Sequence, residues 1–191
     1  MLYKISDFEI ETITISNSKD ATYLQSNKEP FELQTDWITL GQYPLPGKKF
    51  ITEDSKSLNL TIPTSKKDDN YIVLSAVDSN LSKLKTLRNK NYHSLIAEKE
   101  LKYYLKFKLY TNTGLFDKDK NRISITSLFD FYKYLKEDTS MKIVFGFSKM
   151  WTMGNEYGFS MGVKRILLKD DVVAITPEPK INFFDDDDSD K

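Results

Sequence analysis

Lysine and tyrosine side chains alternate with apolar ones along residues 101–110. If this segment is a strand, successive side chains point to opposite faces of a sheet. One face is then the apolar row Leu101, Tyr103, Leu105, Phe107 and Leu109, and the other is Lys102, Tyr104, Lys106, Lys108 and Tyr110. Ammonium groups neutralise the phosphates of a nucleic-acid strand, and exposed aromatic rings stack on its bases. The same pattern suits a solvated outer barrel face, so alternation leaves both interpretations open.

Two other regions carry aromatic and basic residues that could join this face in binding nucleic acid. The first is a segment with a proline–glycine loop, where the candidates are Trp37, Tyr43, Lys48 and Lys49. The second lies toward the C-terminal end, where the candidates are Lys149, Trp151, Lys164 and Arg165. Tryptophan is largely buried more often than it is displayed, so each tryptophan is a candidate for the core as well as for ligand contact.

Residue sets typical of enzymes are missing from the chain. His93 is the only histidine, and its polar surroundings indicate a surface residue. No Gly-x-Ser-x-Gly elbow and no glycine-rich phosphate loop is present. The absence of cysteine excludes disulfides, thiolate zinc sites and cysteine nucleophiles. Asp185–Asp188 supply charge without the converging geometry that a hard cation requires. We therefore expect a protein that is not an enzyme and that has no metal and no cofactor.

Charge is distributed unevenly along the 191 residues, although the formal net charge is zero. Residues 185–191 contain five of the 28 acidic residues and one of the 28 basic ones, which leaves 27 bases and 23 acids elsewhere. A body of net charge +4 joined to an acidic tail is the asymmetry that suggests a polyanion-binding surface. No apolar run approaches the roughly 20 residues that span a bilayer, and no secretory signal begins the chain. We expect an intracellular protein that does not contact membranes.

Strand patterns dominate, because β-branched and aromatic residues recur between polar turns at residues 8–15, 31–35, 37–41, 57–63, 71–77, 101–110, 141–151 and 157–168. Two segments favour short helices, residues 79–90 and 127–136, each preceded by residues that can cap a helix. The chain is therefore predicted to be all-β, that is, mainly β with short helical insertions, and barrel-like over residues 1–179. The aspartate run predicts a disordered acidic tail over residues 180–191.

In the order of these features the chain resembles the single-stranded DNA-binding proteins of nucleocytoplasmic large DNA viruses and of phages. The resemblance covers about residues 30–170. It rests on Phe31–Trp37, Tyr71–Leu81, Tyr103–Leu109 and Lys142–Leu168, the last containing Trp151 and the run Gly158–Met161. Asp36 stands where the family often shows proline. The tail Phe183-Phe184-Asp185-Asp186-Asp187-Asp188-Ser189-Asp190 looks like the aromatic–acidic tails of single-strand binders, with the aromatics before the acids rather than after them.

The resemblance implies an OB-fold and sequence-tolerant binding of single-stranded DNA during viral or phage-type replication or recombination. A hypothesis for the tail follows: its aspartates occupy the basic groove until DNA displaces them, and the freed tail recruits a polymerase or a helicase. Self-association is also compatible with the family, and a viral origin would place the protein at a replication site in the host cytoplasm or nucleus. The main alternative is a protein-interaction or virion structural β-domain that does not bind nucleic acid.

Overall fold

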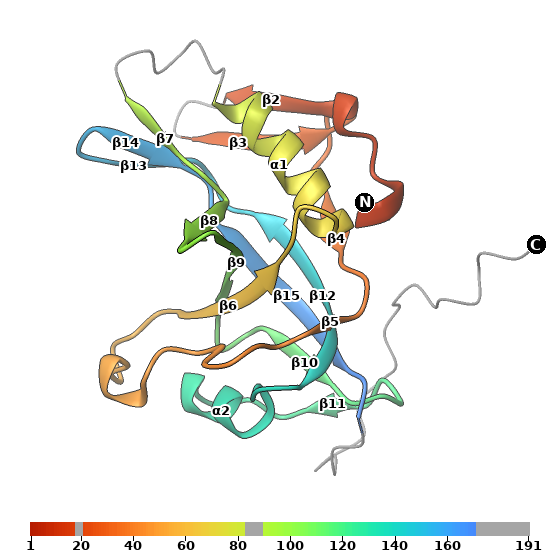
Figure 1. The fold of residues 1–191 in the computed structure, drawn as a ribbon, viewed down its shortest axis with the longest axis vertical. Coiled ribbons are helices and arrows are strands. Elements are labelled where there is room, and N and C mark those ends of the chain that lie inside the picture. Colours follow the sequence, from red (N-terminus) through yellow and green to blue (C-terminus); the bar gives the residue numbers. More distant parts are fainter. Residues whose placement is uncertain (18–20, 83–89, 171–191) are drawn as a thin grey trace, which may run out of the picture.

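The alternating segments form strands in the computed structural model, which describes residues 1–17, 21–82 and 90–170 (Figure 1). Within these residues the chain is mainly β, with two α-helices, α1 (Asp69–Leu81) and α2 (Phe131–Tyr134). The strands are β1 (Leu2–Lys4), β2 (Ile13–Asn17), β3 (Thr22–Ser26), β4 (Glu32–Gln34), β5 (Ile38–Thr39), β6 (Leu58–Thr64), β7 (Asn91–His93), β8 (Ile96–Lys99), β9 (Lys102–Leu109), β10 (Gly114–Phe116), β11 (Arg122–Ile123), β12 (Ser140–Phe147), β13 (Trp151–Met153), β14 (Glu156–Gly158) and β15 (Met161–Leu168). Short 3-10 helices are η1 (Ile5–Asp7), η2 (Ile10–Thr12), η3 (Lys48–Phe50) and η5 (Leu128–Asp130).

Most strands belong to one ten-stranded sheet, whose main path runs β1-β4-β12-β15-β10-β11. The antiparallel pair β12 and β15 forms its centre, with a register shift between Val144 and Phe145. Strand β9 joins β15 in parallel and also pairs with β6 and β8. A separate three-stranded sheet, β13-β14-β7, extends from one end of the molecule (Figure 1). The pairing between β9 and β15 brings the lysine-rich strand next to the C-terminal strands.

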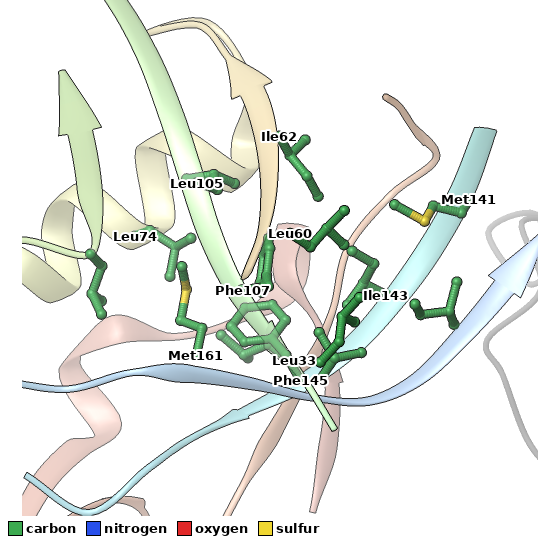
Figure 2. Close-up of a cluster of buried hydrophobic side chains, with 14 of the residues drawn as sticks. Leu33, Leu60, Ile62, Leu74, Leu105, Phe107, Met141, Ile143, Phe145 and Met161 are labelled. Atoms are coloured by element: carbon green, nitrogen blue, oxygen red, sulfur yellow. The ribbon is translucent and has the colours of Figure 1, made fainter. Parts of the chain in front are cut away.

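The core is built from the inward face of each long strand (Figure 2). Phe107 of β9 and Phe145 of β12 are both 0% exposed, and their rings meet edge to face with centroids 5.0 Å apart. Figure 2 shows further members around them, from β4, β6, α1, β9, β12 and β15: Leu33, Leu60, Ile62, Leu74, Leu105, Met141, Ile143 and Met161. Because alternate residues of β9 are buried in this core, the residues between them must face the other side of the sheet.

The predicted strand at residues 71–77 is wrong, because this segment lies within helix α1. Its β-branched residues suggested a strand, but the buried positions Asn70, Val73, Leu74, Val77 and Leu81 recur at helical spacing. The Asp68 carboxylate accepts the backbone N–H of Ser65 at 2.6 Å and closes the turn that begins the helix. Only the first residues of the predicted helix at 79–90 fall within α1, and residues 83–89 lie outside the described residues.

Other boundaries also differ from the expected ones. The strand predicted from residue 101 begins at Lys102, because Glu100 and Leu101 have φ values of 53° and 63° and form the turn after β8. Leu101 is consequently 87% exposed rather than part of the apolar face. The helix predicted at residues 127–136 is shorter and consists of η5 followed by α2. Residues 8–15 contain η2, and strand β2 starts only at Ile13.

The predicted tail at residues 180–191 lies outside the described residues, so the division of the chain at residue 179 stays a prediction. Within the described residues, neither α1 nor α2 has the length and apolar character of a bilayer-spanning helix.

Candidate nucleic-acid interface

A cavity of about 810 Å³ opens on the side of β9 that faces away from the core. We call it the groove. Its walls come from β6, β7, β8, β9, β13 and residues 148–161, and they consist of Asn59, His93, Ser94, Leu95, Ile96, Ala97, Glu98, Lys106, Lys108, Tyr110, Ser148, Lys149, Trp151, Thr152, Met153, Phe159, Ser160 and Met161. Three lysines, Lys106, Lys108 and Lys149, therefore meet three large aromatic residues, Tyr110, Trp151 and Phe159, in one concave surface.

Strand β9 supplies the basic wall of the groove because its side chains alternate between two faces. Leu105, Phe107 and Leu109 are buried, whereas Lys106 is exposed and Lys108 is half-buried. Asn59 of β6 pairs with Lys108 and lies on the same face of the sheet. The two lysines consequently project from a rigid sheet, in which the fully buried Phe107 between them fixes their direction.

Trp151 is held at the groove by the β13–β14 hairpin. It pairs with Gly158, where a side chain could not fit, because a Cβ there would lie 2.7 Å from Cζ2 of the indole. The indole thus rests on the glycine backbone. His93 packs beside it, with ring centroids 5.5 Å apart, and the Nδ1 of His93 lies 3.8 Å from a Glu156 carboxylate oxygen. These contacts present a half-buried aromatic ring at the groove wall.

Lys149 is positioned by backbone hydrogen bonds on both of its sides. The N–H of Ser148 donates to the carbonyl of Ser160 at 2.8 Å, and the N–H of Met150 donates to the carbonyl of Thr22 at 2.8 Å. The Ser148 hydroxyl also accepts the N–H of Ser160 at 2.9 Å. Lys149 therefore lies just after the end of β12, in a segment held by hydrogen bonds at both neighbouring residues, and two residues before Trp151.

The carboxylate of Asp78 in α1 holds residues 92–96, beside the groove, against the helix through hydrogen bonds. It accepts the Tyr92 hydroxyl at 2.6 Å, the Ser94 hydroxyl, and the N–H groups of Leu95 at 2.9 Å and Ile96 at 3.4 Å. Burial, together with the negative charge and hydrogen bond of Asp78, raises the pKa of Tyr92 far above its usual value. The phenol therefore stays protonated and continues to donate to the carboxylate.

Replacing Asp78 by asparagine is expected to lower the free energy of unfolding by roughly 1.5–3 kcal/mol, the range for hydrogen bonds to charged groups. An amide keeps the shape but turns one acceptor into a donor, which then faces a hydroxyl or N–H donor. Urea denaturation measures the change, with Asp54→Asn as the control because Asp54 is exposed. Equal stability of Asp78→Asn and Asp54→Asn would contradict a fastening role for this carboxylate.

Of the predicted binding residues, the structure brings five together in the groove: Lys106, Lys108, Tyr110, Lys149 and Trp151. A sixth, Lys164, lines a neighbouring cavity of about 310 Å³, which shares Tyr110 and Ser148 with the groove. These residues come from separate parts of the chain, and the pairing of β9 with β15 brings them side by side.

Three predicted residues lie near the groove's strands but do not line it. Lys102 and Tyr104 belong to the first part of β9, where they pair with Lys99 and Ala97 of β8. Arg165 follows Lys164 in β15, and its guanidinium forms an ion pair with Glu32 at 3.1 Å. The register shift in the pairing of β12 with β15 falls at Lys164, which has no partner residue on β12, so the alternation of side chains is interrupted between Lys164 and Arg165.

Trp37 lies away from the groove, in a second hydrophobic cluster with Phe116, Val144 and Leu167. Its ring is contacted by the ammonium groups of Lys142 and Lys169, at 5.0 Å and 5.6 Å from the centroid. Trp37 thus packs against this cluster and also lines a separate cavity of about 430 Å³, whereas Trp151 lines the groove, and ligand contact by either tryptophan stays a prediction.

Tyr43, Lys48 and Lys49 belong to the loop before β6, which lies with α2 at the opposite end of the molecule from β13 and β14 (Figure 1). Tyr43 is 83% exposed, and Lys49 lies 5.1 Å from the ring of the exposed Phe50. Lys48 approaches the Tyr132 ring at 5.5 Å, and the Tyr132 hydroxyl donates to the carbonyl of Pro46 at 2.6 Å. The loop is thus a separate basic and aromatic surface.

The sequence did not predict His93, Asn59 or Met153 as groove residues. His93 is a surface residue, as interpreted, with 55% of its side chain exposed. It reaches the groove through the parallel pairing of β7 with β14, which joins segments far apart in the chain. Asn59 could have been found, because it alternates with the buried Leu58 and Leu60 on a predicted strand.

Comparison with known proteins gives matches at the level of structure alone. No family model matches the chain, and no curated protein matches its sequence. The structure of gp2.5, a single-stranded DNA-binding protein encoded by bacteriophage T7, is similar with a TM-score of 0.48 and 10% identity, over 79% of this chain and 98% of that one. The single-stranded DNA-binding protein of bacteriophage Enc34 gives 0.49 and 9%, over 86% and 93%. Its complex with single-stranded DNA gives 0.47 and 8%, over 87% and 99%. The chain thus matches structures of phage single-stranded DNA-binding proteins over most of its length.

Proposed function

We propose that this protein binds single-stranded DNA in the groove, with little dependence on sequence. The observation that supports this proposal is the meeting of Lys106, Lys108 and Lys149 with Tyr110 and Trp151 in one open cavity. The lysines neutralise phosphates, and the aromatic rings stack on bases. Every base has a π-face, so stacking tolerates any sequence, whereas bases paired in a duplex are stacked on each other and unavailable to these rings.

The proposal extends to the rest of the predicted surface. Lys102 and Tyr104 continue the outward face of β9, and the loop with Tyr43, Lys48 and Lys49 offers further phosphate contacts to a longer strand. The proposed fold of residues 1–179 is an OB-like barrel. The proposed role of the protein is in viral or phage-type DNA replication or recombination.

The tail is proposed to regulate the groove. Its aspartates, Asp185–Asp188 and Asp190, compete with DNA for the lysines, and the displaced tail with Phe183 and Phe184 recruits replication proteins such as a polymerase or a helicase. Deleting residues 180–191 is then expected to tighten single-stranded DNA binding at low salt, where charge attraction is least screened. Unchanged affinity of the deletion variant at low salt would exclude competition.

The deciding experiment is a fluorescence titration with oligo-dT at several salt concentrations, beside a duplex of equal length. The chain has two tryptophans, so Trp37→Phe leaves Trp151 as the only tryptophan reporter. We expect quenching by the single strand, weaker binding of the duplex, and an affinity that falls as salt rises. A triple variant with alanine at Lys106, Lys108 and Lys149 should reduce the slope of log affinity against log salt by about 2, or ~0.7 for each lost phosphate contact. Equal binding of single strand and duplex, or no dependence on salt, would exclude this function.

A further inference from the structure

The cavity beside the groove has an unusual floor. It is lined by Tyr110, Asn112, Gly146, Phe147, Ser148, Gly162, Val163 and Lys164, and its volume of about 310 Å³ lies at the lower end of small-ligand sites. Gly146 of β12 and Gly162 of β15 are direct cross-strand partners, one pair from the end of the ladder between these two strands. Two adjoining residues of the sheet therefore lack side chains at this place.

The fold itself does not require glycine at either position. Neither residue has the positive φ that favours glycine. A Cβ on Gly162 would lie 3.5 Å from the Tyr110 ring, and a Cβ on Gly146 would lie 3.6 Å from the Phe31 carbonyl oxygen and 3.8 Å from Cε of Lys164. These are ordinary van der Waals distances, so alanine would fit.

Glycine inside a strand weakens it and often marks a β-bulge, such as the register shift between Val144 and Phe145 beside this pair, or a place where a ligand or another backbone approaches closely. Within the described part of the chain, the neighbours of these two positions leave room for a methyl group, so close packing of the fold does not explain them. The surroundings point to the chemistry of the ligand. A stretch of peptide backbone without side chains is bordered by the Tyr110 ring on one side and by the stems of Lys164 and Glu32 on the other.

We propose that this cavity holds one nucleotide of the bound strand, with the base lying on Gly146 and Gly162 next to Tyr110 and the phosphate at Lys164. This inference rests on the proposed function and adds the path that the bound DNA strand follows across the protein surface. Tyr110 and Ser148 line both cavities, so the strand passes from Trp151 and β9 across β15 to β12. A base can approach a glycine backbone closely, whereas one added methyl group lifts it away from the floor.

The test is the double variant Gly146→Ala, Gly162→Ala in the full chain, titrated with oligo-dT beside the unsubstituted protein. We expect the affinity for oligo-dT to fall about tenfold or more, because the loss of one stacked base weakens binding by a factor of that order. Thermal unfolding is expected at the same or a higher temperature, because alanine reduces the freedom of the unfolded chain. Weaker binding together with equal or greater stability separates a blocked site from a damaged fold.

The control is Ser79→Ala, a small substitution at an exposed position of α1 that lines neither cavity, and it should leave both the affinity and the unfolding temperature unchanged. Equal affinity of the double variant and the unsubstituted protein would overturn the nucleotide site while leaving the groove proposal intact. If the unsubstituted protein does not bind oligo-dT, the proposed function fails, and this inference fails with it.

Discussion

The double variant Tyr110→Ala, Trp151→Ala is expected to bind oligo-dT about 30-fold to 10⁴-fold more weakly than the unsubstituted chain. Each stacked base contributes ~1–3 kcal/mol, and a factor of ten in affinity corresponds to about 1.4 kcal/mol. Both rings line the groove, so their truncation removes both proposed stacking contacts and leaves the three lysines in place. Titration monitored by fluorescence anisotropy of a labelled oligonucleotide measures the change without relying on tryptophan.

Two comparisons separate lost stacking from lost structure. Trp151→Phe retains an aromatic ring over Gly158 and should keep most of the affinity that Trp151→Ala loses. Tyr23→Ala removes a partly exposed tyrosine from β3 that lines neither cavity, and it should leave affinity unchanged. If the double variant unfolds at the same temperature and binds as tightly as the unsubstituted chain, these two rings do not contact the DNA.

Phe107→Ala is expected to lower the free energy of unfolding by roughly 3–5 kcal/mol, the usual effect of truncating a buried phenylalanine. The ring is 0% exposed, meets Phe145 edge to face, and belongs to the strand that pairs with β6, β8 and β15. Truncation leaves a cavity that the surrounding strands can fill only in part. Small domains are stable by only about 5–15 kcal/mol, so a substantial fraction of the protein could unfold.

Urea denaturation measures this effect, and Phe50→Ala is its control. Phe50 is 69% exposed, and its truncation should change stability by no more than about 0.5 kcal/mol. Similar midpoints for the two variants would contradict the packing of Phe107. Because Phe107 lies between Lys106 and Lys108, the cavity should also loosen the basic wall and weaken DNA binding in the fraction that stays folded.

Local sequence was sufficient to predict strand β9 and its two faces. A period of two is a local property of a strand, so Lys106, Lys108 and Tyr110 could be assigned to one face from their spacing. The same reasoning failed at residues 71–77, where β-branched residues indicated a strand. Propensity is a weak prior there, because burying Val73, Leu74 and Val77 along one side of α1 decides the structure.

Tertiary structure alone decided which candidates meet. The sequence alone did not distinguish Trp37 from Trp151, yet Trp37 packs against a hydrophobic cluster and Trp151 lines the groove. The difference arises from a contact between distant segments, because the hairpin of β13 and β14 pairs with β7 through β14. Composition, charge asymmetry and strand alternation were therefore determined by the sequence itself. The groove and its glycine-floored neighbour depend on which strands pair, because pairing over long separations in sequence is set by the packing of the whole sheet.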